Sequence, residues 1–587
     1  MPGIMGEFMS YIPKTVIIVL SSSLLVGLTL NPVFCSRFLK SDSNQKININ
    51  HGGKGFVKFQ NWYVDKLKYA LKKPFVVLIT MILIVILGIF LYTKAGKEPI
   101  FFPSSDPQVA LVNLELPQGT PLQESDKIIR KIEALIPKVP GSIESFQGIV
   151  GRKANRDGSS KTGFQYANVR IGFKPFIDRD ISASSTIDHL KDSLAEFPFA
   201  KVSVDELNNG PPTGYPISYQ VTGDSYEIIG ALSDSILQIL SPYSEFKLAD
   251  YDYEEGKPEI KVEIDREKAV KFGLSTSLIA STIRESMNGG IISKYREGKK
   301  EYDIVIRYND TNKNSITDLA AIIISKEGKH IPLSSVAQIY TQAGPGIIKR
   351  QDLRRSVQVF ADFKDNVQNK EEIKKSIAAK VSQLEVPLGY AIGSGEGAKT
   401  QDEATAFLGQ AFLIALLLIF ILLIVQFNSI TQPFIIMMSV FLSVGGVFWG
   451  LTLFDQEFVI IMSGIGIISL AGVVVNNAIV LIDYTNLLVK QGQTHYDAIV
   501  NASSSRLRPV LLTAITTVLG MLPMALGIAF DFSSFTLVLE SESSAMWESM
   551  AWAIIYGLIF ATILTLIIVP ILLAVSYTHL RAHETRI

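Results

Sequence analysis

The sequence has few of the residues that bind metal ions or form disulfides. Cys35 is the only cysteine among 587 residues, which excludes an intramolecular disulfide and a cysteine zinc site. The six histidines are scattered, and none lies in an HExxH or similar ligand motif. Met287 is the only methionine between Lys94 and Ala406. These absences argue against a metalloenzyme, and the last one disfavours a carrier of soft metal ions, which prefer sulfur ligands.

A charge imbalance and a nucleotide-binding motif are missing as well. The 55 basic and 55 acidic residues cancel, so no basic excess favours a nucleic-acid partner. The glycine-rich stretch 389–397 lacks the Lys-Ser/Thr pair that ends a phosphate-binding loop. We therefore expect neither an enzyme nor a cofactor, and any transport would draw its energy from an ion gradient.

Long apolar runs dominate the rest of the sequence. Seven runs are close to, or longer than, the roughly 20 residues that a membrane-spanning helix needs. They cover residues 14–34, 75–92, 407–426, 434–454, 458–483, 508–530 and 549–575. No run within residues 93–406 is long enough to cross a bilayer. The pattern predicts a polytopic α-helical membrane protein with one large external domain.

Charged residues between the runs predict the orientation. Residues 36–74 carry nine lysines and arginines but only two aspartates, an excess typical of a cytoplasmic loop. Within this loop, residues 56–71 have apolar positions at helical spacing, which fits a helix on the membrane surface or an ordinary solvated loop. Alternation then places 455–457 and 531–548 outside, and both carry only acidic charges. We expect seven spans with the amino terminus outside.

The external domain contains the same order of elements twice. Strand, helix, strand, strand, helix and strand are expected over residues 109–207, and a second set over 217–308. Two such sets predict a large α+β domain of two ferredoxin-like split βαβ modules. The stretch 210–214, Gly-Pro-Pro-Thr-Gly, is the expected joint between them.

Polar residues interrupt the fifth apolar run, where an unpartnered polar side chain is costly. Asn476 and Asn477 lie in its middle, and the small residues Gly464, Gly466 and Gly472 allow neighbouring helices to approach closely. Amides in membrane helices commonly form hydrogen bonds between helices, but polar positions inside a membrane also mark transport pathways. Both interpretations stay open at this point.

Two blocks of sequence resemble a known family. GIGIISLAGVVVNNAIVLIDY (464–484) and RLRPVLLTAITTVLGMLPMALG (506–527) resemble helices ten and eleven of resistance-nodulation-division (RND) efflux permeases of the AcrB type. The resemblance extends over nearly the whole chain, but only to the second half of such a permease and one preceding helix. It therefore implies the carboxy-terminal portion of a permease, a fragment.

The resemblance also divides the chain into parts. Those that it implies are a transmembrane helix like the family's sixth (1–35), a cytoplasmic basic loop with a surface helix (36–74), a second transmembrane helix (75–92), a periplasmic porter and docking domain (93–406) and a five-helix transmembrane domain (407–575). A docking subdomain is expected inside the second module, around 224–352. Residues 576–587 have no counterpart in the family, and we expect them to be an artefactual tail.

The function implied by the resemblance is proton-driven multidrug efflux across the bacterial inner membrane. Permeases of this kind work as homotrimers with a periplasmic adaptor protein and an outer-membrane channel, and they export amphiphilic small molecules. The resemblance implies no cofactor and no nucleic acid. Two alternatives remain, a metal-ion exporter of the same superfamily and a non-transporting or lipid-handling relative of the RND/patched-like superfamily.

The resemblance also suggests residues for a proton relay. In the family, a lysine of helix ten faces an aspartate pair of helix four, near a threonine and an arginine of helix eleven. Alignment places Asn476 at the lysine, Thr513 at the threonine and Arg506 at the arginine, with Asn477 as a further candidate. An amide cannot carry the positive charge that lowers a carboxylate pKa, so relay and structural roles both stay open for Asn476. Asp483 is the only carboxylate within the spans, and we expect it to anchor the inner end.

Aromatic residues of the external domain are candidates for a substrate cleft between the modules. Phe146, Phe164, Tyr166 and Phe173 lie on expected strands of the first module. Aromatic side chains on strands either line binding clefts or, more often, fill the core beneath the sheet. Both roles stay open for these four residues.

Overall fold

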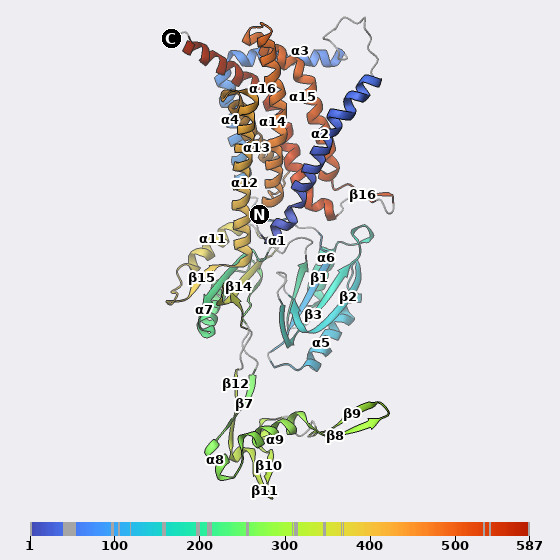
Figure 1. Cartoon of the computed structure of the whole chain (residues 1–587), viewed down its shortest axis with the longest axis vertical. Coiled ribbons are helices and arrows are strands. Elements are labelled where there is room, and N and C mark those ends of the chain that lie inside the picture. Colours follow the sequence, from blue (N-terminus) through green and yellow to red (C-terminus); the bar gives the residue numbers. More distant parts are fainter. Residues whose placement is uncertain are drawn as a thin grey trace.

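The computed structural model describes residues 3–38, 54–94, 99–103, 106–117, 119–154, 160–194, 200–207, 214–253, 258–307, 309, 315–343, 348–364, 367, 369–531, 535–538 and 542–584. A bundle of long helices occupies one end of the molecule and a sheet-rich region the other (Figure 1). Within the described residues, seven helices are long and apolar enough to cross a membrane. Each overlaps one of the seven apolar runs of the sequence.

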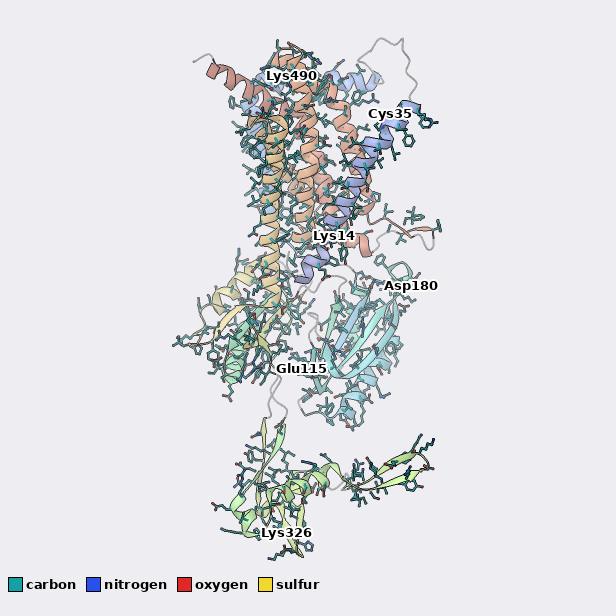
Figure 2. The ribbon with its side chains drawn as sticks, viewed as in Figure 1. Lys14, Cys35, Glu115, Asp180, Lys326 and Lys490 are labelled. Carbon is teal, nitrogen blue, oxygen red and sulfur yellow. The ribbon has the colours of Figure 1, made fainter. Side chains whose placement is uncertain are left out.

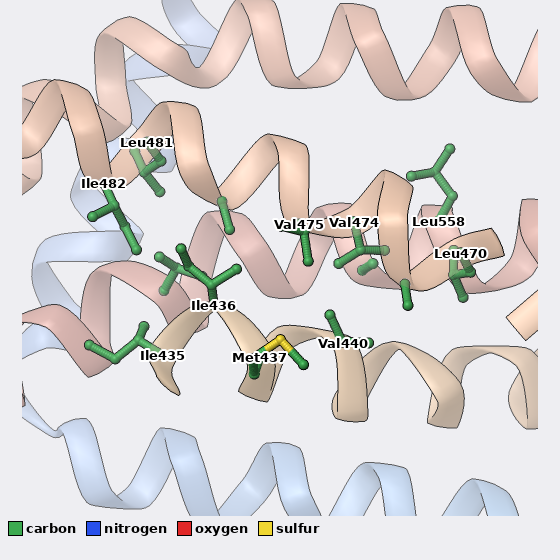
Figure 3. Close-up of a cluster of buried hydrophobic side chains, with 14 of the residues drawn as sticks. Ile435, Ile436, Met437, Val440, Leu470, Val474, Val475, Leu481, Ile482 and Leu558 are labelled. Atoms are coloured by element: carbon green, nitrogen blue, oxygen red, sulfur yellow. The ribbon is translucent and has the colours of Figure 1, made fainter. Parts of the chain in front are cut away.

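The helix bundle begins with a short helix, α1 (Gly3–Met9). The seven candidate spans are α2 (Tyr11–Phe38), α4 (Pro74–Lys94), α12 (Glu396–Phe427), α13 (Thr431–Leu453), α14 (Ile460–Lys490), α15 (His495–Ala525) and α16 (Glu542–Glu584). At the centre, α13, α14 and α16 bury a large apolar cluster that includes Ile436, Val440, Leu470, Val474 and Leu558 (Figure 3). No residue of α2 is buried, so this helix gains little stability from packing. Its backbone N–H and C=O groups form hydrogen bonds within the helix itself.

Glycine allows α13 to approach α16 closely. Gly446 and Gly450 are four residues apart and therefore lie on one face of α13. A Cβ added at either position would overlap the ring of Phe560 or Tyr556, respectively. Close backbone approach of this kind is how helices associate where no hydrophobic driving force acts between them.

One helix lies crosswise at the end of the bundle that is far from the sheets (Figure 1). This helix, α3 (Lys54–Lys72), packs Tyr63 and Leu67 against Leu507 of α15 and Leu566 of α16. The Tyr63 hydroxyl donates a hydrogen bond to the carbonyl oxygen of Leu566 at 2.7 Å. Of the two interpretations of residues 56–71, the helical one therefore fits the structure.

The first module is a four-stranded antiparallel sheet with two helices. Its elements are β1 (Val109–Glu115), α5 (Leu122–Leu135), β2 (Ile143–Ala154), β3 (Ser160–Phe173), α6 (Ala183–Leu194) and β4 (Lys201–Leu207). The strand order is β2-β3-β1-β4. Apolar residues such as Val112, Leu114, Val169 and Ile171 pack in the core with the helices and are completely buried. The other face of the central strand β1 is buried as well, since Leu111 and Asn113 are at most 5% exposed.

The second module repeats this order with a long insertion after its second strand. Its elements are β5 (Ile217–Gly223), α7 (Tyr226–Leu240), β6 (Phe246–Tyr251), β14 (Arg354–Phe363), α11 (Lys370–Val381) and β15 (Ala391–Ser394), with the short β13 (Arg350–Gln351) at one edge of β14. The strands β6, β14, β5 and β15 lie side by side in this order. The prediction that residues 259–308 complete the second set is therefore wrong, because β14, α11 and β15 take those places.

The insertion, called here the inserted subdomain, is connected to the second module through two paired strands. Its elements are β7 (Pro258–Ile264), α8 (Arg266–Lys271), α9 (Thr276–Asn288), β8 (Gly290–Glu297), β9 (Lys300–Ile306), α10 (Ile316–Ala320), β10 (Ile323–Lys326), β11 (Lys329–Pro332) and β12 (Ala337–Ala343). Strand β7 pairs with β12, and a separate small core includes Leu274, Ile279 and Leu333. The predicted start of this part near Asp224 is too early, since α7 packs Ile236 into the second module.

Candidate transport site

One of the two adjacent asparagines joins two candidate spans. Thr513 of α15 donates a hydrogen bond from its Oγ1 to Oδ1 of Asn477 on α14 at 3.0 Å, and the same hydroxyl lies 2.9 Å from the carbonyl oxygen of Val510. Asn477 is only 7% exposed. Both positions were candidates for the proton relay, and the structure brings them together.

Asn476 lies on a different face of α14. It is exposed, as are Ser469, Gly472 and Asp483, and the spacing of these four residues places them on one side of the helix. We call this set the polar stripe. Thr513 on the neighbouring helix is exposed beside it. Val473 and Leu487 are exposed on the same side, so this face is mixed, but its hydroxyl, amide and carboxyl side chains are costly against lipid and make the stripe a candidate contact surface for other polar helices.

Arg506 is not brought to Asn476. Its guanidinium lies 4.3 Å from the ring centroid of Tyr484, which is a cation–π contact. Its Nε is buried and has no hydrogen-bond partner among the described residues. Tyr484 follows Asn476 by eight positions, about 12 Å along a helix. The structure therefore places the arginine near the end of α14 and separates it from Asn476.

The three glycines proposed for helix packing have different surroundings. A Cβ added at Gly466 would lie 3.0 Å from the Met550 carbonyl oxygen and 3.2 Å from the Ala553 Cβ, so α14 approaches α16 closely here. At Gly464 the nearest atom would be Leu408 Cδ1 at 3.4 Å. At Gly472 no atom lies within 4 Å, because this residue belongs to the exposed stripe.

The four aromatic candidates of the first module fall into two groups. Tyr166 and Phe173 are buried, and Phe173 packs in the core beneath the sheet. Phe146 on β2 and Phe164 on β3 are exposed. Among the described residues these four side chains do not form one common surface.

A charged contact between the modules has no local signal in the sequence. Asp250 of β6 lies 3.0 Å from Lys201 Nζ and 3.6 Å from Lys153 Nζ, and Lys153 also lies 2.8 Å from Glu115. Lys161 donates a hydrogen bond to the carbonyl oxygen of Tyr251 at 3.0 Å. Glu115 lies on the side of the first module that is turned toward the second (Figure 2). We call Lys153, Lys161, Lys201 and Asp250 the inter-module cluster.

Burial and charge act against each other in this cluster. Burial alone raises the pKa of Asp250, but Lys201, Lys153 and Lys161 together outweigh it and hold that pKa below its ordinary value. Burial lowers the pKa of Lys153, but Glu115 and Asp250 outweigh it and the pKa is raised. The nearby Asp205 shows the opposite balance, since burial raises its pKa despite a hydrogen bond from the Asn113 amide.

A metal centre has no support in the described part of the chain. There, no three histidine, cysteine, aspartate or glutamate side chains gather in a way that could hold a metal ion. Met287 packs against the core of the inserted subdomain, where it fills space between apolar side chains.

Known proteins resemble nearly the whole chain. The swarming motility protein SwrC of Bacillus subtilis (strain 168) is 25% identical over 573 residues, which are 97% of this chain and 52% of that protein. The cobalt-zinc-cadmium resistance protein CzcA of Cupriavidus metallidurans is 23% identical over 607 residues, covering 98% and 53%. The multidrug resistance protein MdtC of Photorhabdus laumondii is 25% identical over 597 residues, covering 100% and 55%. The chain thus spans about half the length of the curated relatives that it matches.

The fold is also found among solved structures. A crystal structure of a heavy metal efflux pump superposes with a TM-score of 0.71 at 20% identity, over 90% of this chain and 53% of that one. The family model described as the AcrB/AcrD/AcrF family matches residues 1–576. The chain therefore belongs to the AcrB/AcrD/AcrF family of RND permeases.

Proposed function

We propose that this chain forms the carboxy-terminal part of a proton-driven permease of the bacterial inner membrane that exports amphiphilic compounds. The observation that carries the proposal is the exposed polar stripe beside the Asn477–Thr513 pair, in the middle of two candidate spans. Polar side chains are costly in lipid, so the stripe would meet polar groups of other helices in the complete transporter. Carboxylates supplied there would bind and release protons, and Asn476 would donate a hydrogen bond to them.

The two modules would form the periplasmic substrate path, and we propose a ferredoxin-like fold for both. Their common element order and the matching strand orders β2-β3-β1-β4 and β6-β14-β5-β15 support this proposal. The inter-module cluster holds the modules together through partly buried charges. Substrate would pass between the modules when this contact opens, and the contact would re-form when they close.

The inserted subdomain would serve the assembly of a homotrimer with an adaptor protein and an outer-membrane channel. Its hairpin β8–β9 projects from the molecule (Figure 1) and exposes apolar side chains, among them Ile291, Ile292, Val305 and Ile306. A two-stranded hairpin without a packed face is marginally stable in water. Exposed apolar patches of this kind commonly mark protein contacts. This supports the proposal that a second chain buries the apolar side chains of the hairpin.

We rank amphiphilic compounds ahead of metal ions because the described residues include no cluster of metal ligands. CzcA is named for metal resistance and the superposed structure is a heavy metal pump, so metal export is the second candidate. Soft ions prefer sulfur and imidazole ligands, but Met287 is a core residue and no ligand cluster occurs among the described residues.

A chimera of the first half of MdtC with this chain tests the proposal in a host that lacks its own RND pumps. We expect the chimera to lower the accumulation of an amphiphilic cationic dye, and a protonophore to restore it. Asn476→Leu removes the amide donor and should abolish this export at an unchanged level of protein in the membrane. The matched variant Asn477→Ala should instead lower the amount of folded protein.

Three results of this experiment would count against the proposal. Tolerance to cobalt, zinc or cadmium without dye export would favour the metal exporter. Dye export that persists with the protonophore would exclude proton coupling. Full export by Asn476→Leu would show that the polar stripe only packs against other helices.

A further inference from the structure

The crosswise helix α3 is held against the bundle by one face only. Tyr63 and Leu67 are buried on that face, and Gln60 donates hydrogen bonds from its Nε2 to the backbone oxygen and the Oγ of Ser504, both at 3.0 Å. These contacts fix the rotation of α3 about its own axis. The direction of every other side chain on the helix follows from this rotation.

A second face of α3 combines aromatic rings with lysines. Phe59, Trp62, Lys66 and Tyr69 follow each other at intervals of three, four and three residues, so they lie along one side of the helix. All four are exposed, Trp62 at 56%. Phe59 and Trp62 stack with ring centroids 5.8 Å apart, and Lys58 lies at the border of this face. We call Lys58, Phe59, Trp62, Lys66 and Tyr69 the aromatic–lysine face. The exposed carboxylate of Asp65 lies on the same side, three residues after Trp62, so two lysines stand against one aspartate there.

The position of this face relative to the bundle points to a lipid partner. Only Lys73 separates α3 from α4, whose first turn exposes the apolar Phe75 and Val76. Because α4 is a candidate span, α3 lies at the level where its hydrocarbon section begins. Lys490, at the end of α14, lies at the same end of the bundle (Figure 2). Aromatic rings and lysines gather at this depth because rings prefer the interface and lysines reach the phosphates.

We infer that the aromatic–lysine face binds the headgroups of anionic phospholipids in the leaflet next to α3. This inference rests on the membrane insertion proposed above, but not on the transported substrate. The ring faces of Phe59 and Trp62 lie among the upper acyl chains, and the ammonium groups of Lys58 and Lys66 pair with lipid phosphates. Each lysine near an anionic surface contributes about 1 kcal/mol, and added salt weakens this attraction. Lys68 is two residues after Lys66, about 200° around the helix, and faces water on the other side of α3.

Quenching of Trp62 fluorescence tests this inference. The full chain is reconstituted in vesicles of phosphatidylcholine and phosphatidylglycerol at one fixed ratio, with bromine on the chains of either lipid. The Trp62 signal is the difference between the parent chain and Trp62→Phe. We expect brominated phosphatidylglycerol to quench this signal more strongly than brominated phosphatidylcholine does.

Two sets of variants make the test specific. Lys58→Gln with Lys66→Gln should make the two brominated lipids quench equally, and Lys66→Gln alone should weaken the preference. Lys68→Gln removes the same single charge from a direction about 200° around the helix and should leave the preference intact. Inorganic phosphate at constant ionic strength should not displace the lipid.

Several outcomes would overturn the inference. Equal quenching in the parent chain, or a preference that survives the loss of Lys58 and Lys66, would show that the face does not select anionic lipid. Loss of the preference on adding phosphate would identify a site for the free anion. A Trp62 signal that neither lipid quenches would place the face in water, where a soluble protein would be the partner. Failed dye export by the chimera bears on none of these measurements.

Discussion

At the scale of single residues, the Asn477–Thr513 hydrogen bond gives a direct prediction about stability. Polar contacts between membrane helices contribute about 0.6–2 kcal/mol. We expect Asn477→Ala and Thr513→Val to show a coupling energy of this size in a double-mutant cycle, measured by unfolding of the purified chain. Thr516→Val is the control, because its hydroxyl donates only to carbonyl oxygens of its own helix, those of Leu512 and Thr513. Additive effects of Asn477→Ala and Thr513→Val would contradict the contact.

The raised pKa of Asp205 predicts how stability depends on pH. A carboxyl whose pKa is higher in the folded than in the unfolded chain favours folding most below its unfolded pKa, about 3.9. This contribution is lost as the pH rises through the folded pKa. Asp205→Asn, which cannot ionise, should therefore raise the melting temperature at about pH 7, and the gain should shrink as the pH falls toward about 4. A lower melting temperature of the variant at neutral pH would contradict the burial of this carboxyl.

The residues of the candidate site were only partly predictable from the sequence. The polar positions Asn476, Asn477 and Thr513 stand out because they interrupt apolar runs. Which asparagine meets Thr513 depends on the rotation of α14 against α15, and one helical position changes that direction by about 100°. The contact of Lys153 with Asp250 could not be predicted, because it joins two modules whose relative placement no local pattern encodes.

At the scale of elements, the inter-module cluster predicts which strands share their protection against amide hydrogen exchange. Asp250→Asn removes the carboxylate that Lys201 and Lys153 of the first module contact across the modules, at a cost of roughly 1–3 kcal/mol. We expect faster hydrogen exchange in both β6 and β4 of this variant. The lowered pKa of Asp250 means that its contribution is present above the unfolded pKa and is lost as the pH falls, so acid should mimic the variant.

A matched variant distinguishes loss of the contact between the modules from general destabilisation of the second module. Asp252 forms an ion pair with Lys349 at 2.9 Å and accepts a hydrogen bond from the Gln358 backbone, both inside the second module. Asp252→Asn should speed exchange there and leave β4 of the first module unchanged. Equal exchange in β4 for the parent chain and Asp250→Asn would show that the charges do not couple the modules.

The β8–β9 hairpin predicts a change in oligomeric state. Ile291 and Val305 are paired across the two strands, and both are exposed. Replacing both with aspartate should weaken association between chains, because two charges would have to be buried in the contact. Mass photometry of the detergent-solubilised chain should then show smaller particles. The cross-strand pair Lys294 and Asp303 supplies the control, since Lys294→Gln with Asp303→Asn should leave the particle size unchanged.

The sequence predicted the elements of the sheet-rich region better than their pairing. Strands such as β1 and β5 follow from alternating apolar residues, and the first module has the predicted order. Strand β7 has the same alternation, but it pairs with β12 rather than with β5 or β6. A period of two specifies which face of a strand is apolar and says nothing about a partner that lies far along the chain.

The GGVFWG stretch at 445–450 is the sequence signal for the α13–α16 contact.

At the scale of the whole molecule, the charge bias predicts the orientation of the chain in the membrane. Single cysteines at Ser382 in the second module and at Gln493 between α14 and α15 are introduced into a Cys35→Ser background, because Cys35 is exposed. A membrane-impermeant maleimide applied from the periplasmic side should label only the first. Labelling of both positions from one side would contradict the seven-span arrangement.

The insertion within the second module also sets an order of events during synthesis. Strand β5 pairs with β14, and the whole inserted subdomain lies between them in the chain. The first module is complete at Leu207 and closes without any later residue, whereas the second module must keep β5 and β6 unpaired until β14 emerges. Closing so long a loop is slow, and unpaired strand edges invite wrong partners meanwhile. We therefore expect nascent chains that end before Arg354 to hold a protease-resistant first module beside a second one that chaperones must protect.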